Sequence, residues 1–129
     1  MDYNHEELAL ANFTRWTDAL LTRDPKKVAE LYADDATFLS TMSPEFPKGP
    51  SGAEKYFHHF LAKNPVCKLV EGAVQVLGQN CYAHSGMYDF ELGPEDNRHV
   101  AHARFTFVWR REENGEWKII HHHSSVVPA

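Results

Sequence analysis

Cysteine is scarce in this sequence, with only Cys67 and Cys81 among 129 residues. Two cysteines are too few for the disulfide framework of a small secreted domain. Long apolar runs are missing too, because no segment approaches the roughly 20 apolar residues that span a bilayer. The first seven residues are acidic and polar, without the basic and apolar regions of a signal peptide. We therefore expect a cytoplasmic protein whose two thiols are reduced and buried.

Basic residues are outnumbered as well: 13 lysines and arginines stand against 18 aspartates and glutamates, for a formal net charge of −5. Proteins that bind nucleic acids or anionic membrane surfaces favour basic patches, so we expect neither as a partner. The sequence also lacks a glycine-rich nucleotide loop and a His-Glu-x-x-His metal motif. We therefore predict that the protein uses no cofactor and no metal.

Aromatic residues, by contrast, are plentiful: eight phenylalanines, five tyrosines and three tryptophans. Hydrophobic residues make up 43% of the chain and charged residues 24%, a balance typical of globular proteins. A chain of this length fits one domain, here residues 1–129, and buries roughly two thirds of its surface on folding. Aromatic side chains supply much of the burial in such a core and line many apolar pockets.

The first third of the chain has the three-and-four spacing of apolar residues that predicts helices. A first helix is expected over 4–22, where Asn4 and Glu7 can cap its N-terminus. A second helix is expected over 24–33, because it begins with an Asp-Pro pair that suits the cap and the first turn. A short strand over 36–39 follows.

A proline- and glycine-rich loop over 41–52 separates this strand from a third helix. Connections of this length are often functional. Ser51 can cap the third helix together with Glu54, and the Asn-Pro pair at 64–65 ends it.

From residue 66 onward the apolar period changes to two, which predicts β-strands. Four long strands are expected at 66–77, 81–91, 99–111 and 116–126, joined by hairpin-like turns. Helices that precede a run of strands indicate an α+β fold and not alternating βαβ units. The predicted fold is a cone: a curved antiparallel β-sheet of four long strands and a short one, packed on three N-terminal helices around a cavity.

Three segments resemble a known family. The segments 104–111, Arg-Phe-Thr-Phe-Val-Trp-Arg-Arg, and 115–125, Gly-Glu-Trp-Lys-Ile-Ile-His-His-His-Ser-Ser, resemble the end of the calcium/calmodulin-dependent protein kinase II association domain and of its small stand-alone relatives. The segment 32–38, Tyr-Ala-Asp-Asp-Ala-Thr-Phe, is similar to the helix-to-strand entry of the SnoaL-like proteins. Both groups belong to the nuclear transport factor 2-like superfamily, whose fold is the same cone.

The resemblance also implies function. Association domains form dimers and rings of dimers, whereas other proteins with this cone are isomerases, cyclases and dehydratases of small apolar substrates. The kinase cavity is marked by arginines, and the aligned positions here hold Gly86, Phe107 and Ser124. The resemblance therefore implies a pocket for a neutral, apolar or aromatic ligand. Because the chain contains no kinase motif, the resemblance concerns architecture and not phosphorylation.

Strand alternation predicts which side chains face the cavity, unless a bulge reverses a strand's faces. The larger aromatic side chains favour one set of faces as the concave side. With one residue each from the first helix and the short strand, the predicted ligand-binding residues are Trp16, Phe38, Tyr82, His84, Tyr88, Phe105, Phe107, His122 and Ser124.

Within that set, His84 and Tyr88 are the candidate catalytic pair for proton transfer, with His122 as a third candidate. Burial shifts the pKa values of such groups towards neutral pH, and groups with a pKa near neutral exchange protons efficiently. The alternative interpretation is that they are polar groups satisfied within an aromatic core. The tract 121–123 could suggest a metal, but no carboxylate has a diagnostic spacing to it, so no metal ligand is predicted.

The opposite, convex faces of the last two strands mix apolar, basic and histidine side chains. In a monomer, Val108 and Ile119 would be exposed there, so we expect at least a homodimer with a two-fold axis. Histidines in such an interface would make assembly sensitive to pH. The predicted interface residues are Arg104, Thr106, Val108, His121 and His123.

Two functions of different classes remain open at this point. The first is an oligomerising association module with an aromatic and histidine-lined pocket for a small, mainly apolar ligand. The second is a cofactor-independent isomerase, cyclase or dehydratase that acts on an apolar carbonyl or polycyclic substrate. Both are open because one fold can host many functions.

Overall fold

The computed structural model describes residues 4–40 and 43–129. Helices come first and long strands follow, which confirms the predicted α+β class. The elements are α1 (His5–Leu21), α2 (Pro25–Ala29), β1 (Tyr32–Leu39), α3 (Gly49–Phe60), the 3-10 helix η1 (Leu61–Lys63), β2 (Val66–Gly78), β3 (Cys81–Leu92), β4 (His99–Arg111) and β5 (Trp117–Val126). Among these residues, no helix has the length and apolar composition needed to cross a bilayer.

The first helix starts where its cap predicts. The Asn4 side chain accepts a hydrogen bond from the Glu7 amide at 3.1 Å, which satisfies one of the free N–H groups of the first turn. The second helix is shorter than predicted, because it ends at Ala29 and β1 begins at Tyr32. The reason is pairing with β5: the Leu31 carbonyl already accepts from the Ile119 amide at 2.8 Å.

The start of α3 also differs from the prediction. The helix begins at Gly49, two residues before Ser51, and its N-cap Lys48 makes no side-chain capping bond. Pro50 occupies the first turn, where its missing N–H costs nothing. The proline therefore sets the start of this helix, and Ser51 does not cap it.

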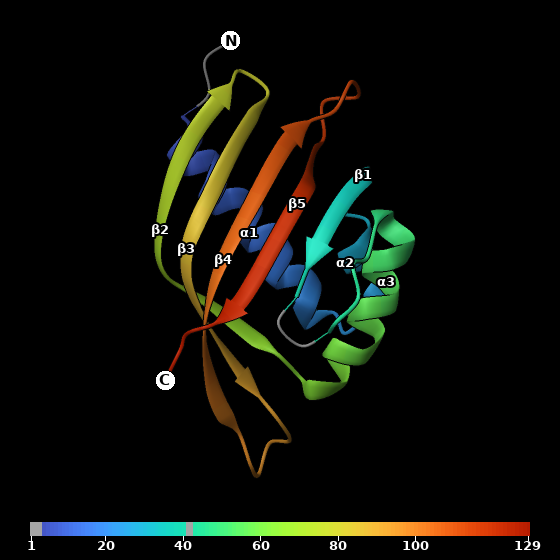
Figure 1. The fold of residues 1–129 in the computed structure, drawn as a ribbon, viewed down its shortest axis with the longest axis vertical. Helices are drawn as coiled ribbons and strands as arrows, with labels where there is room; N and C mark the ends of the chain where they lie inside the picture. The colour runs from blue at the N-terminus through green and yellow to red at the C-terminus, as the bar shows by residue number, and fades with distance from the viewer. Residues whose placement is uncertain (1–3, 41–42) are drawn as a thin grey trace.

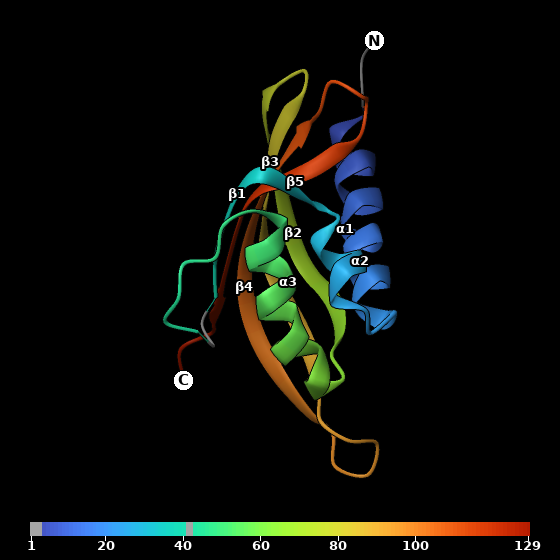
Figure 2. The ribbon, with the colours of Figure 1, turned by 90° about the vertical axis from the view of Figure 1, so that its right-hand side faces the viewer.

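The five strands of the described chain form one curved sheet in the order β1-β5-β4-β3-β2. The pairs from β2 to β5 are antiparallel, as predicted, whereas β1 runs parallel to β5 at the sheet edge and extends over 32–39. In Figure 1, α1 crosses behind the strands, and Figure 2 shows the helices gathered on one side. The other face of the sheet is covered by no element of the described chain.

A pair of glycines bends the β2–β3 ribbon. Gly72 lies opposite Gly86, and the register shifts between Leu69 and Glu71, which is the mark of a bulge. A Cβ atom on Gly86 would lie 1.9 Å from the Glu71 carbonyl oxygen, so the two backbones approach in a way that only glycine permits. The bend helps the sheet curve around α1.

A second irregularity lies between β4 and β5. Val108 is opposite His121, but Trp109 is opposite Ile119, so Ile120 is an extra residue on β5. As a result Ile119 faces the interior and is 0% exposed. The prediction that Ile119 lies on the convex face was therefore wrong, because plain alternation cannot include a bulge.

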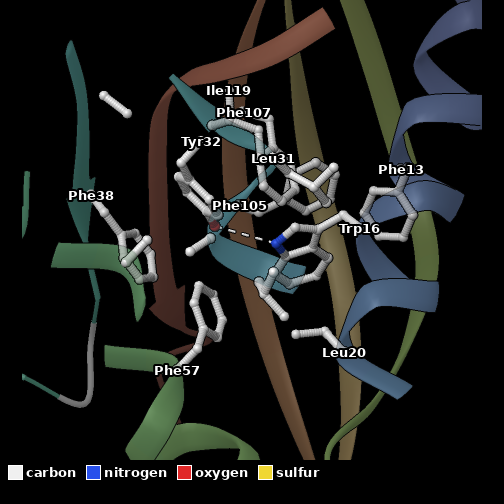
Figure 3. Packing of buried hydrophobic residues seen from close by; sticks show 14 of the residues in the cluster. Phe13, Trp16, Leu20, Leu31, Tyr32, Phe38, Phe57, Phe105, Phe107 and Ile119 are labelled. Carbon is white, nitrogen blue, oxygen red and sulfur yellow. Dashed lines mark hydrogen bonds between the residues drawn. The ribbon is translucent and has the colours of Figure 1, made fainter. Parts of the chain in front are cut away.

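Aromatic side chains from both layers fill the interior of the cone (Figure 3). Trp16 of α1 meets Phe107 of β4 with ring centroids 5.1 Å apart, and Phe38 of β1 stacks on Phe57 of α3 at 5.7 Å. Burying each of these side chains contributes about 1.5–3 kcal/mol to folding. The rings therefore hold the helices on the sheet and leave limited space between them.

Candidate functional site

The side chain of His122 lies in the middle of the aromatic interior and is 1% exposed. Its ring is sandwiched between Phe38, at a centroid distance of 4.6 Å and an angle of 9°, and Phe107, at 4.1 Å and 21°. The edge of Trp16 closes a third side at 5.4 Å. The bulge in β5 brings His122 to this inner face together with Ile119.

Both ring nitrogens of His122 bond to buried tyrosines. Nδ1 lies 2.9 Å from Oη of Tyr32, and Nε2 lies 3.2 Å from Oη of Tyr88. At one end of this chain, Nε1 of Trp16 donates to Tyr32 at 3.2 Å. At the other end, Tyr88 donates to Oγ of Ser124 at 2.6 Å. A continuous hydrogen-bonded chain thus runs across the interior from α1 through β1 and β5 to β3.

The number of protons available on the two tyrosine hydroxyls determines which ring nitrogen of His122 carries a proton. A tyrosine hydroxyl has one proton, so Tyr88, which donates to Ser124, accepts from Nε2. Nδ1 then accepts from Tyr32. Burial, followed by the charges of His121 and His123, lowers the pKa of His122 well below its usual value and keeps the ring neutral. Burial likewise raises the pKa of Tyr32 and Tyr88, so their hydroxyls stay protonated.

A small cavity of about 60 Å³ lies beside this chain. Its lining is mainly aromatic, and it includes five of the nine predicted ligand-binding residues: Trp16, Phe38, Tyr88, His122 and Ser124. Lys63 is the one residue with a formal charge among the described residues that line it. The cavity is far smaller than the ~300–1,000 Å³ of typical ligand pockets, because the cone is largely filled by its own side chains.

The other four predicted residues are also buried, but they do not line this cavity: Tyr82, His84, Phe105 and Phe107. Tyr82 accepts a hydrogen bond from Nδ2 of Asn12 at 2.9 Å. His84 packs edge-on against Phe105 at 5.2 Å. These side chains share the inner face with the cavity, as the alternation predicted, but they lie farther along the strands under α1.

His84 and Tyr88 do not form a hydrogen-bonded pair in the described structure. Nδ1 of His84 is buried without a hydrogen-bond partner among the described residues, and burial lowers the pKa of this ring. A Cβ on Gly72 would come within 2.5 Å of its Nε2, so the ring occupies the space that the glycine leaves. The structure joins Tyr88 to His122 and Ser124 instead.

Sequence reasoning missed two tyrosines of the site. Tyr32 was predicted only to lie on the inner side of the second helix. In the structure it belongs to β1, and its hydroxyl forms a hydrogen bond with Nδ1 of His122. Tyr56 of α3 lines the cavity and its hydroxyl accepts from Ser40 at 2.8 Å. The segment around Tyr32 already carried the family resemblance, and that was the one signal that could have singled it out.

The predicted interface residues share one face of β4 and β5. Three cross-strand pairs place them together: Arg104 with Ser125, Thr106 with His123, and Val108 with His121. Nε of Arg104 donates to Oγ of Ser125 at 3.2 Å.

At the β1 edge of this face, Nδ1 of His121 lies 2.7 Å from Oγ1 of Thr37. Burial first, and the charge of His123 second, lower the pKa of His121. The described residues contain no group of three or more histidines, cysteines or carboxylates placed to hold a metal.

Residues 5–128 match the family model of the calcium/calmodulin-dependent protein kinase II association domain. The chain belongs to this family. An association domain candidate of the same kinase type from Xanthomonas campestris is 38% identical, with a TM-score of 0.91 over 98% of this chain and 90% of that one. The association-domain fold therefore covers nearly the whole sequence.

More distant structures share this association-domain fold. A nuclear transport factor 2-like protein from Salmonella enterica is 21% identical, with a TM-score of 0.80 over 95% of this chain and 91% of that one. A ketosteroid isomerase candidate from Parabacteroides distasonis is 23% identical, with a TM-score of 0.69 over 89% and 84%. No protein with a curated description matches the chain.

Proposed function

We propose that this association domain is a self-associating module that binds a small, mainly apolar ligand in its cone. The observation that carries the proposal is the uncovered outer face of the sheet. At its centre Thr106, Val108 and His121 are half-buried, and Arg104 and His123 flank them as exposed polar groups. A half-buried centre around Val108 with an exposed polar rim suits an interface of mixed polarity, and a two-fold axis would place the patch against itself.

Light scattering on the full chain at micromolar concentration tests self-association. We expect the mass of a dimer or a larger even assembly. Val108→Asp should give a monomer, because it places a charge at the centre of the contact without filling the interior. The matched control is Val76→Asp, which changes a valine that is 57% exposed on β2 and should leave the mass unchanged. A monomeric wild-type protein would refute the proposal.

The cavity supports the ligand part of the proposal. Its walls are aromatic and its polar groups are few, which suits an apolar molecule with one hydroxyl or carbonyl group. Its volume of about 60 Å³ restricts the ligand to a few heavy atoms unless side chains move. Acetone, which has a carbonyl group and only a few heavy atoms, is a suitable probe: amide NMR shifts should cluster around Tyr88 and His122 and weaken in Tyr88→Phe. Shifts spread evenly over the surface would argue against a binding cavity.

A cofactor-independent enzyme is the second candidate, and the hydrogen-bonded chain through His122 favours it. A neutral imidazole between two tyrosine hydroxyls could pass a proton to or from a carbonyl compound in the cavity. Tyr88 and His122 would then be the catalytic residues, and His84 would not. Deuterium exchange next to the carbonyl of acetone, followed by NMR, tests this. Exchange that is lost in Tyr88→Phe and kept in His84→Gln supports the enzyme; equal rates in all three proteins exclude it.

A further inference from the structure

Three chain reversals lie close to one another, and one of them, the β3–β4 connection, forms the lowest loop in Figure 1. The first follows α1, the second follows η1, and the third is the β3–β4 connection over 93–98. Arg23 in the first reversal and Asn64 in the second both have positive φ, at 59° and 53°. Two arginines, Arg23 and Arg98, link these reversals through main-chain carbonyls.

Arg23 is held by one nitrogen of its guanidinium group. Nη1 donates to the carbonyl of Leu20, at the end of α1, and to the carbonyl of Pro65, at the start of β2. A guanidinium carries five N–H groups in a rigid fork. Only Nη1 of Arg23 is used in these bonds, and its Nε and Nη2 groups make no hydrogen bond within the described chain.

Arg98 is held in the same way from the neighbouring reversal. Its Nη1 donates to the carbonyl of Asn64 at 2.8 Å and to that of Gly93, and its Nη2 donates to the carbonyl of Glu91 at 2.9 Å. Asn64 directly precedes Pro65, whose carbonyl binds Arg23. The two guanidinium groups are thus fixed on adjacent carbonyls, and both keep N–H groups to spare.

Within the part of the chain that the structure describes, Arg23 and Arg98 lack an anionic partner. Both line one open hollow of about 680 Å³, in which Glu95 is the one acidic residue among the described lining. Neither arginine forms an ion pair with a carboxylate in the described residues. Burial, and then the charge of Arg98, lower the pKa of Arg23, which agrees with two like charges in reach of each other.

We propose that Arg23 and Arg98 together bind a phosphate group, either as free phosphate or as the terminal group of a small phosphomonoester. Two guanidinium forks with spare donors match a tetrahedral oxyanion with three or more free oxygens better than a carboxylate with two. A phosphate dianion also offsets both positive charges. Because main-chain carbonyls already hold both guanidinium groups in place before phosphate binds, little side-chain entropy is lost on binding.

The proposal is tested by amide NMR titrations of the full chain with sodium phosphate and with glycerol 3-phosphate. Sodium chloride and sodium acetate at equal ionic strength serve as references. Saturable shifts at residues 23, 64 and 93 are expected with both phosphate compounds. Shifts with inorganic phosphate alone would assign the site to the free anion. Equal shifts with chloride or acetate would overturn the proposal.

Variants separate binding from the structural role of the two arginines. Arg98→Gln should weaken phosphate binding at least about tenfold, as expected for loss of charge-assisted hydrogen bonds. Since this change also removes contacts to carbonyls, Glu95→Gln provides a test that leaves those contacts intact: affinity should rise about threefold as repulsion falls. Lys55→Gln, an equal loss of charge on α3, should change affinity less than twofold, within ordinary ionic screening. Unchanged binding in both folded Arg98→Gln and Glu95→Gln would refute the site.

Discussion

The inner face of the sheet carries two buried histidines, one on each of the strands that flank Phe107 of β4, and their surroundings differ. His84 on β3 is 2% exposed and His122 on β5 is 1% exposed, and aromatic rings surround both. His122 uses both ring nitrogens, towards Tyr32 and Tyr88, whereas Nδ1 of His84 meets no partner in the described chain. Similar solvent exposure with unequal hydrogen bonding indicates that the surroundings of His122 are organised as a polar network. We expect His84 to cost stability, because its Nδ1 is buried without a hydrogen-bond partner in the described chain.

The largest expected loss of stability comes from a change in the backbone of β3, the strand that carries His84. Gly86→Ala should destabilise the protein by about 3 kcal/mol or more, because the new Cβ would overlap the Glu71 carbonyl and one of the two strands must move. Gly78→Ala is the matched control, since nothing lies within 4 Å of its Cβ position. Urea unfolding of both variants measures the difference. Similar stability in the two would contradict the close approach at the bend.

The second prediction tests the two histidines directly. His122→Leu should lower the free energy of unfolding by about 2–4 kcal/mol, because the hydroxyls of Tyr32 and Tyr88 lose a buried partner. His84→Leu should change it by less than about 1 kcal/mol or raise it, since an unpaired polar group is removed. Urea unfolding at pH 7.5 compares them. An equal loss in both would mean that the surroundings of the two histidines do not differ.

Acid should lower the free energy of unfolding through both His84 and His122. The pKa values of His84 and His122 are lowered by burial, so the folded state binds fewer protons than the unfolded state below about pH 6.5. Their contribution to stability is complete above that pH and is lost as pH falls, by up to about 1.4 kcal/mol per pH unit for each ring. Unfolding at pH 7.5, 6.5 and 5.5 measures the slope. His84→Leu and His122→Leu should each reduce the slope of stability against pH. An unchanged slope in both variants would contradict the lowered pKa values of the two histidines.

The smallest effect concerns a hydroxyl near His84. Tyr82→Phe should cost about 0.5–1.5 kcal/mol, because Asn12 loses one acceptor. Asn12 keeps its bond from Nη1 of Arg15 at 2.9 Å, so the loss is only partial. Tyr88→Phe removes a hydroxyl that both accepts from His122 and donates to Ser124, and should cost more. Thermal unfolding of the pair gives the order, and a reversed order would contradict the network.

Local patterns predicted much of the fold. The strand over 99–111 was predicted with its observed bounds, and β3 began at Cys81 as expected, because a period of two and turn residues are readable in one sequence. The parallel pairing of β1 with β5 and the inward position of Ile119 were not predicted. Both depend on the register between strands, which no single segment contains.

The site was predicted in the same uneven way. Tyr88, His122 and Ser124 were placed on one inner face by alternation, and they line the cavity. That Tyr82 and His84 lie outside it follows from how far α1 and its side chains extend over the sheet, which is a tertiary effect. Tyr32 lies 90 residues from its partner His122, so no local pattern could have paired them.

The extra residue in β5 has a consequence for length variation in this family. Without the bulge at Ile120, residues three apart such as Ile119 and His122 would face opposite sides of the sheet. Removing Ile120 would restore regular alternation while Ile119 and His122 still faced inward and His121 and His123 outward. Shortening the strand by that one residue should therefore be tolerated. Inserting one more residue beside it also makes the spacing between Ile119 and His122 even, so both would still face inward, but the pairing of the histidine tract with β4 would move by two residues.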